Sequence, residues 1–228
     1  MIFGGFQKLT LLDYPGKVAC TLFTKGCNFY CPFCHNALLV DGEETGEYTE
    51  EYILDFLKKR YGILDGVCIT GGEPLINKEI KDFIKKVKEL GYSIKLDTNG
   101  SFPKELKDLA ENKLIDYVAM DIKNSIAKYP QTSGCEKLDT NIIEESIDFL
   151  LSGKIDFEFR TTVVKELHTI SDIQDIGVRI KGAPKYFLQN FVDSGHIIGE
   201  NLSPVDEETL EKMRLAALKS VKSAEIRG

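Results

Sequence analysis

Positive charge in excess, long apolar runs and low-complexity segments are all missing from this sequence. Its 29 Lys and Arg residues are outnumbered by 36 Asp and Glu residues, which leaves a formal net charge of −7. Binding to nucleic acid or to a membrane surface needs a basic surface, so neither partner is expected. No apolar run approaches the ~18 residues of a membrane-spanning helix, and no signal-peptide pattern is present. We therefore expect a cytoplasmic globular protein.

No linker or internal repeat divides the chain either. We expect a single domain over residues 1–228, with its core from about 17 to 190 and a C-terminal helical tail over about 203–228. Within the core, strand-like runs alternate with amphipathic, charge-rich stretches. The strands are predicted near 17–24, 66–70, 92–96, 116–121, 156–163 and 185–190, and the helices near 49–60, 77–90, 103–111, 140–151, 171–181 and 206–222.

This alternation is typical of βα units that build a parallel sheet, so the predicted fold class is α/β. Six units are too few for a closed eight-stranded barrel, which leaves an open partial barrel or a doubly wound sheet. Both architectures bind ligands at the carboxyl ends of their strands. Chemically distinctive motifs are therefore expected directly after strands.

Cysteines supply the first such motif. Three of the six cysteines lie close together, at Cys27, Cys31 and Cys34. A disulfide framework would be dispersed and would belong to an oxidising compartment, so this group indicates metal ligation or redox chemistry. Cys20 and Cys68 lie in apolar strand-like runs and are expected to be buried thiols. Cys135 receives no functional assignment.

The C-x3-C-x2-C spacing can wrap one iron–sulfur cluster. Cubane clusters usually have four cysteine ligands, so three ligands leave one iron open to a cofactor or substrate. Two other interpretations remain at this point. Cys68 or Cys135 could complete an electron-transfer cluster, and His35 could complete a zinc site, although its adjacency to Cys34 suits a tetrahedral metal poorly.

Further polar groups follow the next predicted strands. GGEP at 71–74 combines two flexible glycines with Glu73, and DTNG at 97–100 and DIK at 121–123 follow later strands. The next strand carries Arg160, and His168 comes shortly after it. Each group alone is typical of a turn or a cap. Together, they are what a zwitterionic, ribose-containing cofactor lying across the sheet would need.

These motifs resemble those of radical S-adenosylmethionine (SAM) enzymes. CNFYCPFC at 27–34 matches the CxxxCxxC motif of that family, and GGEP, DTNG and DIK follow in the order seen in glycyl-radical-enzyme activating enzymes. The resemblance extends from about residue 5 to about 190. The stretch 5–36 is most similar to the activating protein of anaerobic ribonucleoside-triphosphate reductase. The implied fold is a partial (β/α)6 barrel with a parallel sheet and outer helices.

The resemblance also implies site residues. Cys27, Cys31 and Cys34 would ligate a [4Fe–4S] cluster, SAM would chelate the fourth iron, and Phe33 would lie against the adenine. The other implied contacts are Gly71, Gly72 and Glu73 with the methionine ammonium, Asp97, Thr98 and Asp121 with a monovalent cation, Lys123 with the SAM carboxylate, His168 with the ribose, and Asn99 and Arg160 in the same pocket without assigned contacts.

The implied reaction is radical activation of a protein. Flavodoxin or ferredoxin would reduce the cluster, SAM would be cleaved to methionine and a 5′-deoxyadenosyl radical, and that radical would take a hydrogen atom from a glycine Cα of the partner under anaerobic conditions. The protein supplies orientation and the cofactors supply the chemistry, so no catalytic acid or base is expected. The chain has no eight-cysteine insert after Cys34, so no auxiliary cluster is expected. This favours anaerobic ribonucleotide reductase or pyruvate formate-lyase as partner.

Two other functions are kept as alternatives. One is radical SAM chemistry on a small molecule, similar to 7-carboxy-7-deazaguanine synthase, and the other is a non-catalytic Fe–S redox protein. If the protein is an activase, we expect segment 36–48 and the region after Pro184 to contact the partner, because they flank the mouth of the predicted site.

Overall fold

A computed structural model describes residues 1–41, 46–193 and 195–227. These residues form a sheet in the order β3-β1-β2-β4-β5-β6-β7-β8-β9. All neighbouring pairs from β2 to β9 are parallel, and β1 pairs antiparallel with both β2 and β3. The strands are β1 (Ile2–Thr10), β2 (Ala19–Thr24), β3 (Tyr48–Thr49), β4 (Gly66–Gly71), β5 (Ser93–Thr98), β6 (Tyr117–Asp121), β7 (Asp156–Val163), β8 (Tyr186–Asn190) and β9 (Ala224–Arg227).

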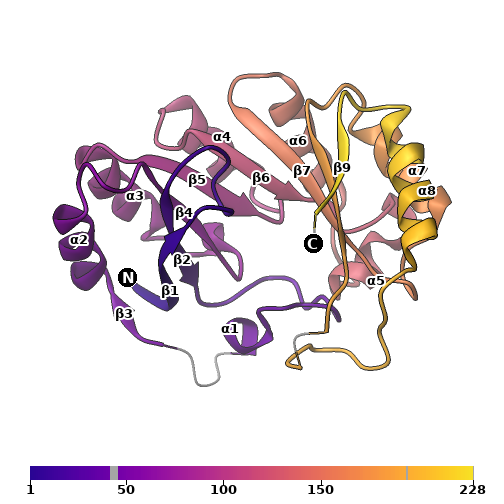
Figure 1. The fold of residues 1–228 in the computed structure, drawn as a ribbon, viewed down its shortest axis with the longest axis horizontal. Coiled ribbons are helices and arrows are strands. Elements are labelled where there is room, and N and C mark those ends of the chain that lie inside the picture. The colour runs from indigo at the N-terminus through magenta and orange to yellow at the C-terminus, as the bar shows by residue number, and fades with distance from the viewer. Residues whose placement is uncertain (42–45, 194, 228) are drawn as a thin grey trace.

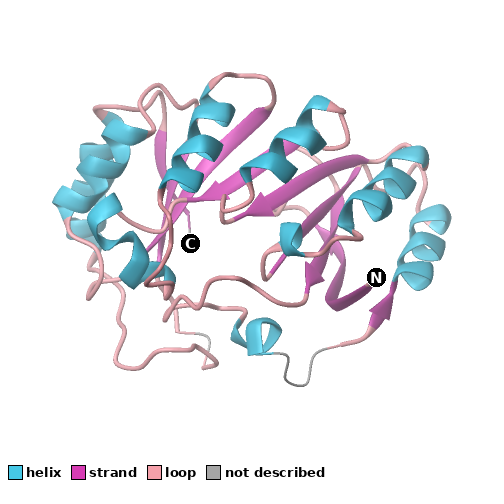
Figure 2. Ribbon diagram, turned by 180° about the vertical axis from the view of Figure 1, so that it is seen from behind, coloured by secondary structure: helices cyan, strands magenta, loops and turns pink. Residues whose placement is uncertain are grey.

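Most of the helices cover the outer side of this sheet, which curves into an open arc, while the short helix α1 lies across its open side (Figure 1). Figure 2 shows the same arrangement from behind, with the strands inside the row of helices. The helices are α1 (Ala37–Asp41), α2 (Glu50–Lys59), α3 (Ile80–Glu89), α4 (Pro103–Glu111), α5 (Tyr129–Ser133), α6 (Asn141–Leu151), α7 (Ile170–Arg179) and α8 (Glu207–Leu218), with 3-10 turns η1 (Pro74–Ile76) and η2 (Ile126–Lys128).

Amphipathic spacing explains how these helices attach to the sheet. In α3, Ile80, Phe83, Ile84 and Val87 recur at helical spacing and are buried, while the lysines between them face solvent. The β-strands present apolar side chains to this layer, and one large hydrophobic cluster joins helices and sheet. Burial of this face, at about 25 cal/mol per Å² of apolar surface, is the main stabilising contribution.

The predicted α/β class and parallel sheet are confirmed. All six predicted strands and all six predicted helices are present, with ends that differ by a few residues. The arrangement of helices along the outer side matches an open arc rather than a doubly wound sheet (Figures 1 and 2). Among the described residues, no helix combines the length and apolarity needed to cross a membrane.

Three strands were not predicted from the sequence, namely β1 and the two edge strands β3 and β9. The region expected as a C-terminal helical tail contains α8 but ends in β9, which pairs with β8 and so extends the sheet. These strands are short or irregular, since β1 contains register shifts against β2 and β3 has two residues. Such short or irregular segments carry little of the alternating apolar pattern by which a strand is recognised.

Candidate functional site

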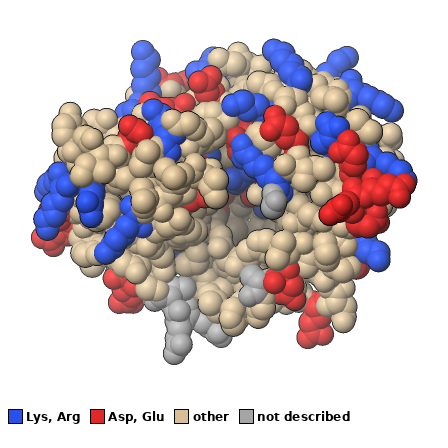
Figure 3. Space-filling view, viewed as in Figure 1, with Lys and Arg blue, Asp and Glu red and all other residues tan. Residues whose placement is uncertain are grey.

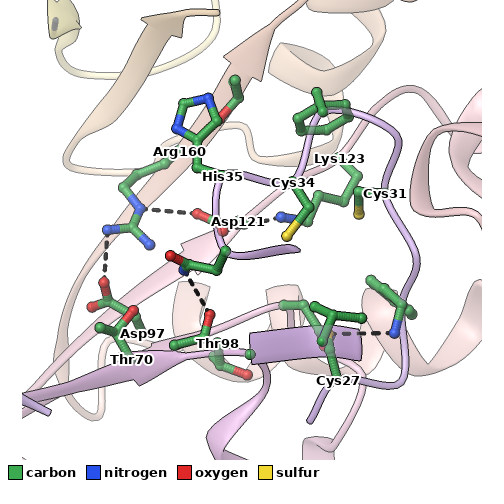
Figure 4. Close-up of a pocket in the computed structure, with 18 of the residues that line it drawn as sticks. Cys27, Cys31, Cys34, His35, Thr70, Asp97, Thr98, Asp121, Lys123 and Arg160 are labelled. Carbon is green, nitrogen blue, oxygen red and sulfur yellow. Dashed lines mark hydrogen bonds and ion pairs between the residues drawn. The ribbon is translucent and has the colours of Figure 1, made fainter. Parts of the chain in front are cut away.

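A cavity opens at the carboxyl ends of the parallel strands, under the segment that carries the cysteines. Figure 3 shows the hollow on the molecular surface, and Figure 4 shows the side chains around it. Most of the residues expected from the sequence line this one cavity, namely Cys27, Cys31, Phe33, Cys34, Gly71, Gly72, Asp97, Thr98, Asn99, Asp121, Lys123 and Arg160. The strand-end rule therefore brings together motifs that are up to 133 residues apart in the sequence, from Cys27 to Arg160.

Backbone hydrogen bonds hold the cysteine loop in place from several sides. The N–H of Gly26 donates to the carbonyl of Leu39 at 2.9 Å, and the N–H of Tyr30 donates to that of Ser133 at 2.8 Å. From the far end of the chain, the N–H of Gly199 donates to the carbonyl of Pro32 at 2.7 Å. The loop has no regular secondary structure of its own, so these long-range contacts determine where its thiols point.

The three thiols fit an iron–sulfur cluster by their chemistry. They line one cavity, whereas no three His, Cys, Asp or Glu side chains within the described ranges are close enough to hold a single metal ion. Burial raises the pKa of Cys27 to about 11 and that of Cys31 to about 12, with Lys123 opposing the shift at both. Thiolate ligands at neutral pH would therefore form together with metal binding, which releases their protons.

The GGEP segment touches the cysteine loop through its backbone. The N–H of Glu73 donates to the carbonyl of Gly26 at 2.9 Å. A Cβ atom on Gly72 would lie 1.9 Å from that same carbonyl oxygen, so only glycine allows this approach. The amide of Asn36 donates to the carbonyl of Gly71 at 2.8 Å and fixes the loop from the other side. The two glycines thus serve contact between loops as well as exposure of backbone to the cavity.

The Glu73 side chain lies behind the cavity lining, and its contact with the SAM ammonium stays a prediction. It is fully buried, is not among the residues that line the cavity, and accepts hydrogen bonds from the Leu75 N–H at 3.1 Å, the Thr98 hydroxyl at 2.9 Å and the Asn99 N–H at 2.6 Å. Burial raises its pKa to about 7, although these hydrogen bonds act in the opposite direction. In this structure the carboxylate caps η1 and holds the DTNG segment against GGEP.

Asn99 in turn connects DTNG with the cysteine loop. Its amide donates to the Asn28 side-chain oxygen at 2.9 Å, and the Asn28 amide donates to the Ser101 hydroxyl at 2.9 Å. The Asn99 nitrogen also lies 3.9 Å from the sulfur of Cys27. A hydrogen-bond donor beside a cluster sulfur is one way in which a protein adjusts a cluster's reduction potential.

A row of alternating charges crosses the floor of the cavity. Arg160 lies between the two aspartates, with Nε 2.9 Å from Oδ1 of Asp121 and Nη1 2.9 Å from Oδ2 of Asp97 (Figure 4). Lys123 is 3.1 Å from the other oxygen of Asp121, and the buried Lys95 pairs with the other oxygen of Asp97. Burial raises the pKa of Asp121, but Arg160 and Lys123 outweigh it and lower that pKa to about 2. Burial likewise raises the pKa of Asp97, but Arg160 and Lys95 outweigh it and lower that pKa, so both aspartates are ionised.

His168 does not reach the cavity surface. It is buried behind Lys123, with Nε2 2.8 Å from the Lys123 carbonyl and Nδ1 3.1 Å from the Val164 N–H. Its ring lies near that of Phe33, with centroids 6.4 Å apart. In this arrangement His168 supports the backbone that carries Lys123, and its contact with the ribose stays a prediction.

Several lining residues were not expected, among them Asn36, Thr70, Thr162 and Gln189. The clearest missed signal is Lys95, which lies between the buried Ile94 and Leu96 in β5 and is only 1% exposed. Lysine is almost never fully buried without a partner, so this position in the sequence already indicated an internal charge. Cys20 and Cys68 are buried in β2 and β4, as expected.

Comparison with known proteins agrees with this site. Residues 21–176, more than half of the chain, match the family model described as "Radical SAM superfamily". This chain therefore belongs to the radical SAM superfamily. The family implies a [4Fe–4S] cluster and SAM as cofactors, and the three cysteines around the cavity fit that implication.

Two relatives and one solved structure are similar to this chain over most of its length. A protein of Methanocaldococcus jannaschii with the provisional name glycyl-radical enzyme activating enzyme MJ1227 is 35% identical over 194 residues, which cover 82% of this chain and 78% of that protein. A second protein of the same organism, provisionally named glycyl-radical enzyme activating enzyme MJ1632, is 25% identical over 81% of this chain and 74% of its own. A radical SAM methyltransferase from Sphaerobacter thermophilus shares the fold, with a TM-score of 0.74 and 12% identity over 96% of this chain and 68% of that one.

Proposed function

We propose that this protein is an activase that generates a glycyl radical in a partner enzyme, with anaerobic ribonucleotide reductase as the partner and flavodoxin or ferredoxin as the electron donor. The observation that carries the proposal is the 35% identity to MJ1227 over most of both chains. The motif order and the similarity of residues 5–36 to the ribonucleotide reductase activating protein support the choice of partner.

In this proposal, different residues of the cavity bind the cluster and the parts of SAM. Cys27, Cys31 and Cys34 hold the cluster, and the backbone at Gly71 and Gly72 faces the adjoining space. Lys123 and Arg160 supply positive charge for the SAM carboxylate, while Phe33 offers a ring for the adenine. A bound cluster, reduced by the electron donor, would supply one electron for cleavage of the C5′–S bond of SAM into methionine and a 5′-deoxyadenosyl radical. That radical would take a hydrogen atom from the partner's glycine, giving 5′-deoxyadenosine and a glycyl radical.

The surface near the cavity carries exposed apolar side chains, which supports a protein as the substrate. Exposed apolar side chains occur on three segments that also contribute lining residues, namely Tyr30 in the cysteine loop, Leu38 in α1 and Val192 just after β8, which are 49%, 39% and 63% exposed. Leu38 and Val192 lie in the two regions expected to contact the partner. Within the first of these regions, residues 42–45 lie outside the described residues.

The proposal is tested with anaerobically reconstituted protein, dithionite and SAM, with and without anaerobic ribonucleotide reductase. We expect 5′-deoxyadenosine together with a glycyl-radical signal in the EPR spectrum of the partner. The Cys31→Ala variant should lose both products, whereas Cys135→Ala, which removes a cysteine that does not line the cavity, should retain them. Cluster-dependent SAM cleavage without a glycyl radical in any candidate partner would contradict the activase function.

A second pair of variants tests the partner surface. Val192→Glu should lower the rate of glycyl-radical formation at least about fivefold, as expected when one apolar contact of an interface is lost. Val178→Glu is the matched control, because Val178 is 67% exposed on α7 and does not line the cavity. Equal effects of the two substitutions would argue against docking at this rim.

A further inference from the structure

The row of charges beneath the cavity determines whether a metal cation can fit there. Asp97 and Asp121 together offer four carboxylate oxygens, and each has a protein cation beside it. Lys95 and Arg160 take the two oxygens of Asp97, and Arg160 and Lys123 take those of Asp121. The sequence predicted a monovalent cation at these two carboxylates, and the space between them holds the Arg160 guanidinium instead.

The charge balance also opposes an additional cation. Three protein cations, Lys95, Arg160 and Lys123, stand against two carboxylates, so the group carries one positive charge in excess. Lys95, Asp97 and Arg160 are largely removed from solvent, and Asp121 is partly exposed. Like charges repel more strongly in such a low-dielectric environment than in water. An anionic ligand group would be favoured there, and a further cation would be disfavoured.

Lys95 is the residue that makes this arrangement possible. Its side chain is 2% exposed, and its Nζ lies 3.6 Å from the sulfur of Cys68 in addition to its pairing with Asp97. It does not line the cavity, so its effect on a ligand must pass through Asp97. It is therefore a positioning residue. Lys95 neutralises the charge of Asp97 at the oxygen that faces the protein interior, and Arg160 pairs with the other oxygen.

We propose that this protein binds SAM without a monovalent metal cation, because Arg160 and Lys95 supply from within the chain the positive charge that such a cation would bring to Asp97 and Asp121. The inference rests on SAM binding by this cavity, which the family implies, and not on the identity of the partner enzyme. It assigns to Lys95 a role in the site although it touches no ligand.

The first test compares cations on the wild-type protein. SAM binding to the anaerobically reconstituted protein is measured by calorimetry in KCl, NaCl, LiCl and choline chloride at equal ionic strength. We expect the dissociation constants to agree within about twofold, since no metal cation contributes a coordinated charge. The thermal midpoint of the cluster-free protein should likewise be the same in KCl and choline chloride. A dissociation constant at least tenfold higher in choline chloride would overturn the proposal.

The second test removes the internal cation. Lys95→Met leaves one oxygen of Asp97 without its partner, so we expect SAM binding to become at least about tenfold tighter in KCl than in choline chloride, the size of an ordinary coupling free energy between two sites. Lys85→Met, at a lysine on the exposed face of α3, should remain insensitive to the cation. Arg160→Gln, which vacates the space between the carboxylates, provides the same comparison if Lys95→Met does not fold.

Each result has a definite meaning. If Lys95→Met and Arg160→Gln both stay insensitive to the cation, the compensating role assigned to these side chains is wrong. None of these measurements uses a partner protein. Failure to detect a glycyl radical would therefore leave this inference intact, and cation-dependent SAM binding would leave the activase function intact.

Discussion

Two charged residues on the same strand belong to separate groups of ion pairs, and the two groups have different roles. Glu158 and Arg160 are two residues apart on β7, so their side chains share one face of the sheet. Glu158 is fully buried and is enclosed by partners, with Arg227 of β9 at 2.7 Å and the Tyr117 hydroxyl at 2.9 Å. Arg160, one step nearer the carboxyl end, lines the cavity between two aspartates.

The difference is one of charge balance and access. At Glu158 a single carboxylate meets a single guanidinium, which also packs over the ring of Phe187 at 3.2 Å, and the group joins the last strand to the sheet. At Arg160 the cations outnumber the carboxylates, and the group lines the cavity that we propose as the SAM site. A charge group inside the fold can thus attach an edge strand to the sheet or form part of a binding site. The two cases differ in net charge: the Glu158 pair is neutral, and the Arg160 group has one positive charge in excess.

The largest expected effect comes from removing the two arginines in turn. Arg227→Met leaves Glu158 buried without its cation, and we expect the free energy of unfolding to fall by about 3 kcal/mol, as for other broken buried ion pairs. Arg160→Met should cost less, because Asp97 keeps Lys95 and Asp121 keeps Lys123. Urea unfolding of both cluster-free variants measures the difference.

Binding of SAM should rank the same two variants in the opposite order. Arg160→Met should weaken SAM binding to the reconstituted protein at least about tenfold, in the range found for buried charge partners of a ligand, and Arg227→Met should leave it unchanged. Calorimetry on both proteins is the measurement. If Arg227→Met impaired SAM binding as much as Arg160→Met did, the assignment of Arg227 to stability and of Arg160 to ligand binding would be wrong.

A smaller effect is expected from adding a methyl group at two glycines. Gly72→Ala would place its Cβ against the Gly26 carbonyl, so the cysteine loop must shift, at about 1–3 kcal/mol for such overpacking. Gly177→Ala on α7 is the matched control, since its nearest neighbour would be 3.5 Å away. Cluster content after reconstitution should fall only in Gly72→Ala. Full cluster content in that variant would show that the two loops need not touch.

The smallest effect concerns Asp172. Like Glu158, this carboxylate is buried and paired within the protein, but it is part of the N-terminal cap of α7. Burial raises its pKa, but hydrogen bonds from Lys128, from Thr169 and from Ser125 outweigh it and lower that pKa to about 2. Because the folded-state pKa is below the ordinary value of 3.8, the stabilisation is complete above about pH 4 and is lost as the pH falls toward 2.

Replacement of this cap should therefore show mainly at neutral pH. Asp172→Asn is expected to lower the free energy of unfolding at pH 7 by about 1 kcal/mol and to flatten its decline below pH 4. Urea unfolding between pH 2 and pH 7 measures both. The exposed Asp175 on the same helix supplies the control, and Asp175→Asn should retain the wild-type acid limb. An unchanged slope in Asp172→Asn would assign the acid sensitivity to other carboxylates.

Much of the fold was readable from local patterns, and the reason is visible in particular elements. The helix α4 has the predicted bounds, since Pro103 begins it and Leu106 and Leu109 recur on its buried face. The six core strands are apolar runs bounded by turns. The strands β1, β3 and β9 were missed because β1 has register shifts and no regular alternation of apolar residues, and because β3 and β9 have only two and four residues.

The candidate site was predictable to the extent that its residues follow strands. The ordering of cysteines, GGEP, DTNG and DIK along parallel strands was enough to place them around one cavity. The sequence did not reveal how these side chains would pair. Glu73 turns away from the cavity to hold Thr98 and Asn99, and His168 stands behind Lys123.

By itself, the sequence determined the chemistry available to this protein: three thiols at cluster spacing, two glycines, and acids and bases at strand ends. These are local properties, set by residue type and by periods of two and 3.6 residues. Only the tertiary structure decided that Arg160 lies between Asp97 and Asp121 while Lys95 compensates them from below. The physical reason is that each of these charges is stabilised by a partner on another strand, and strand neighbours are fixed by folding rather than by sequence proximity.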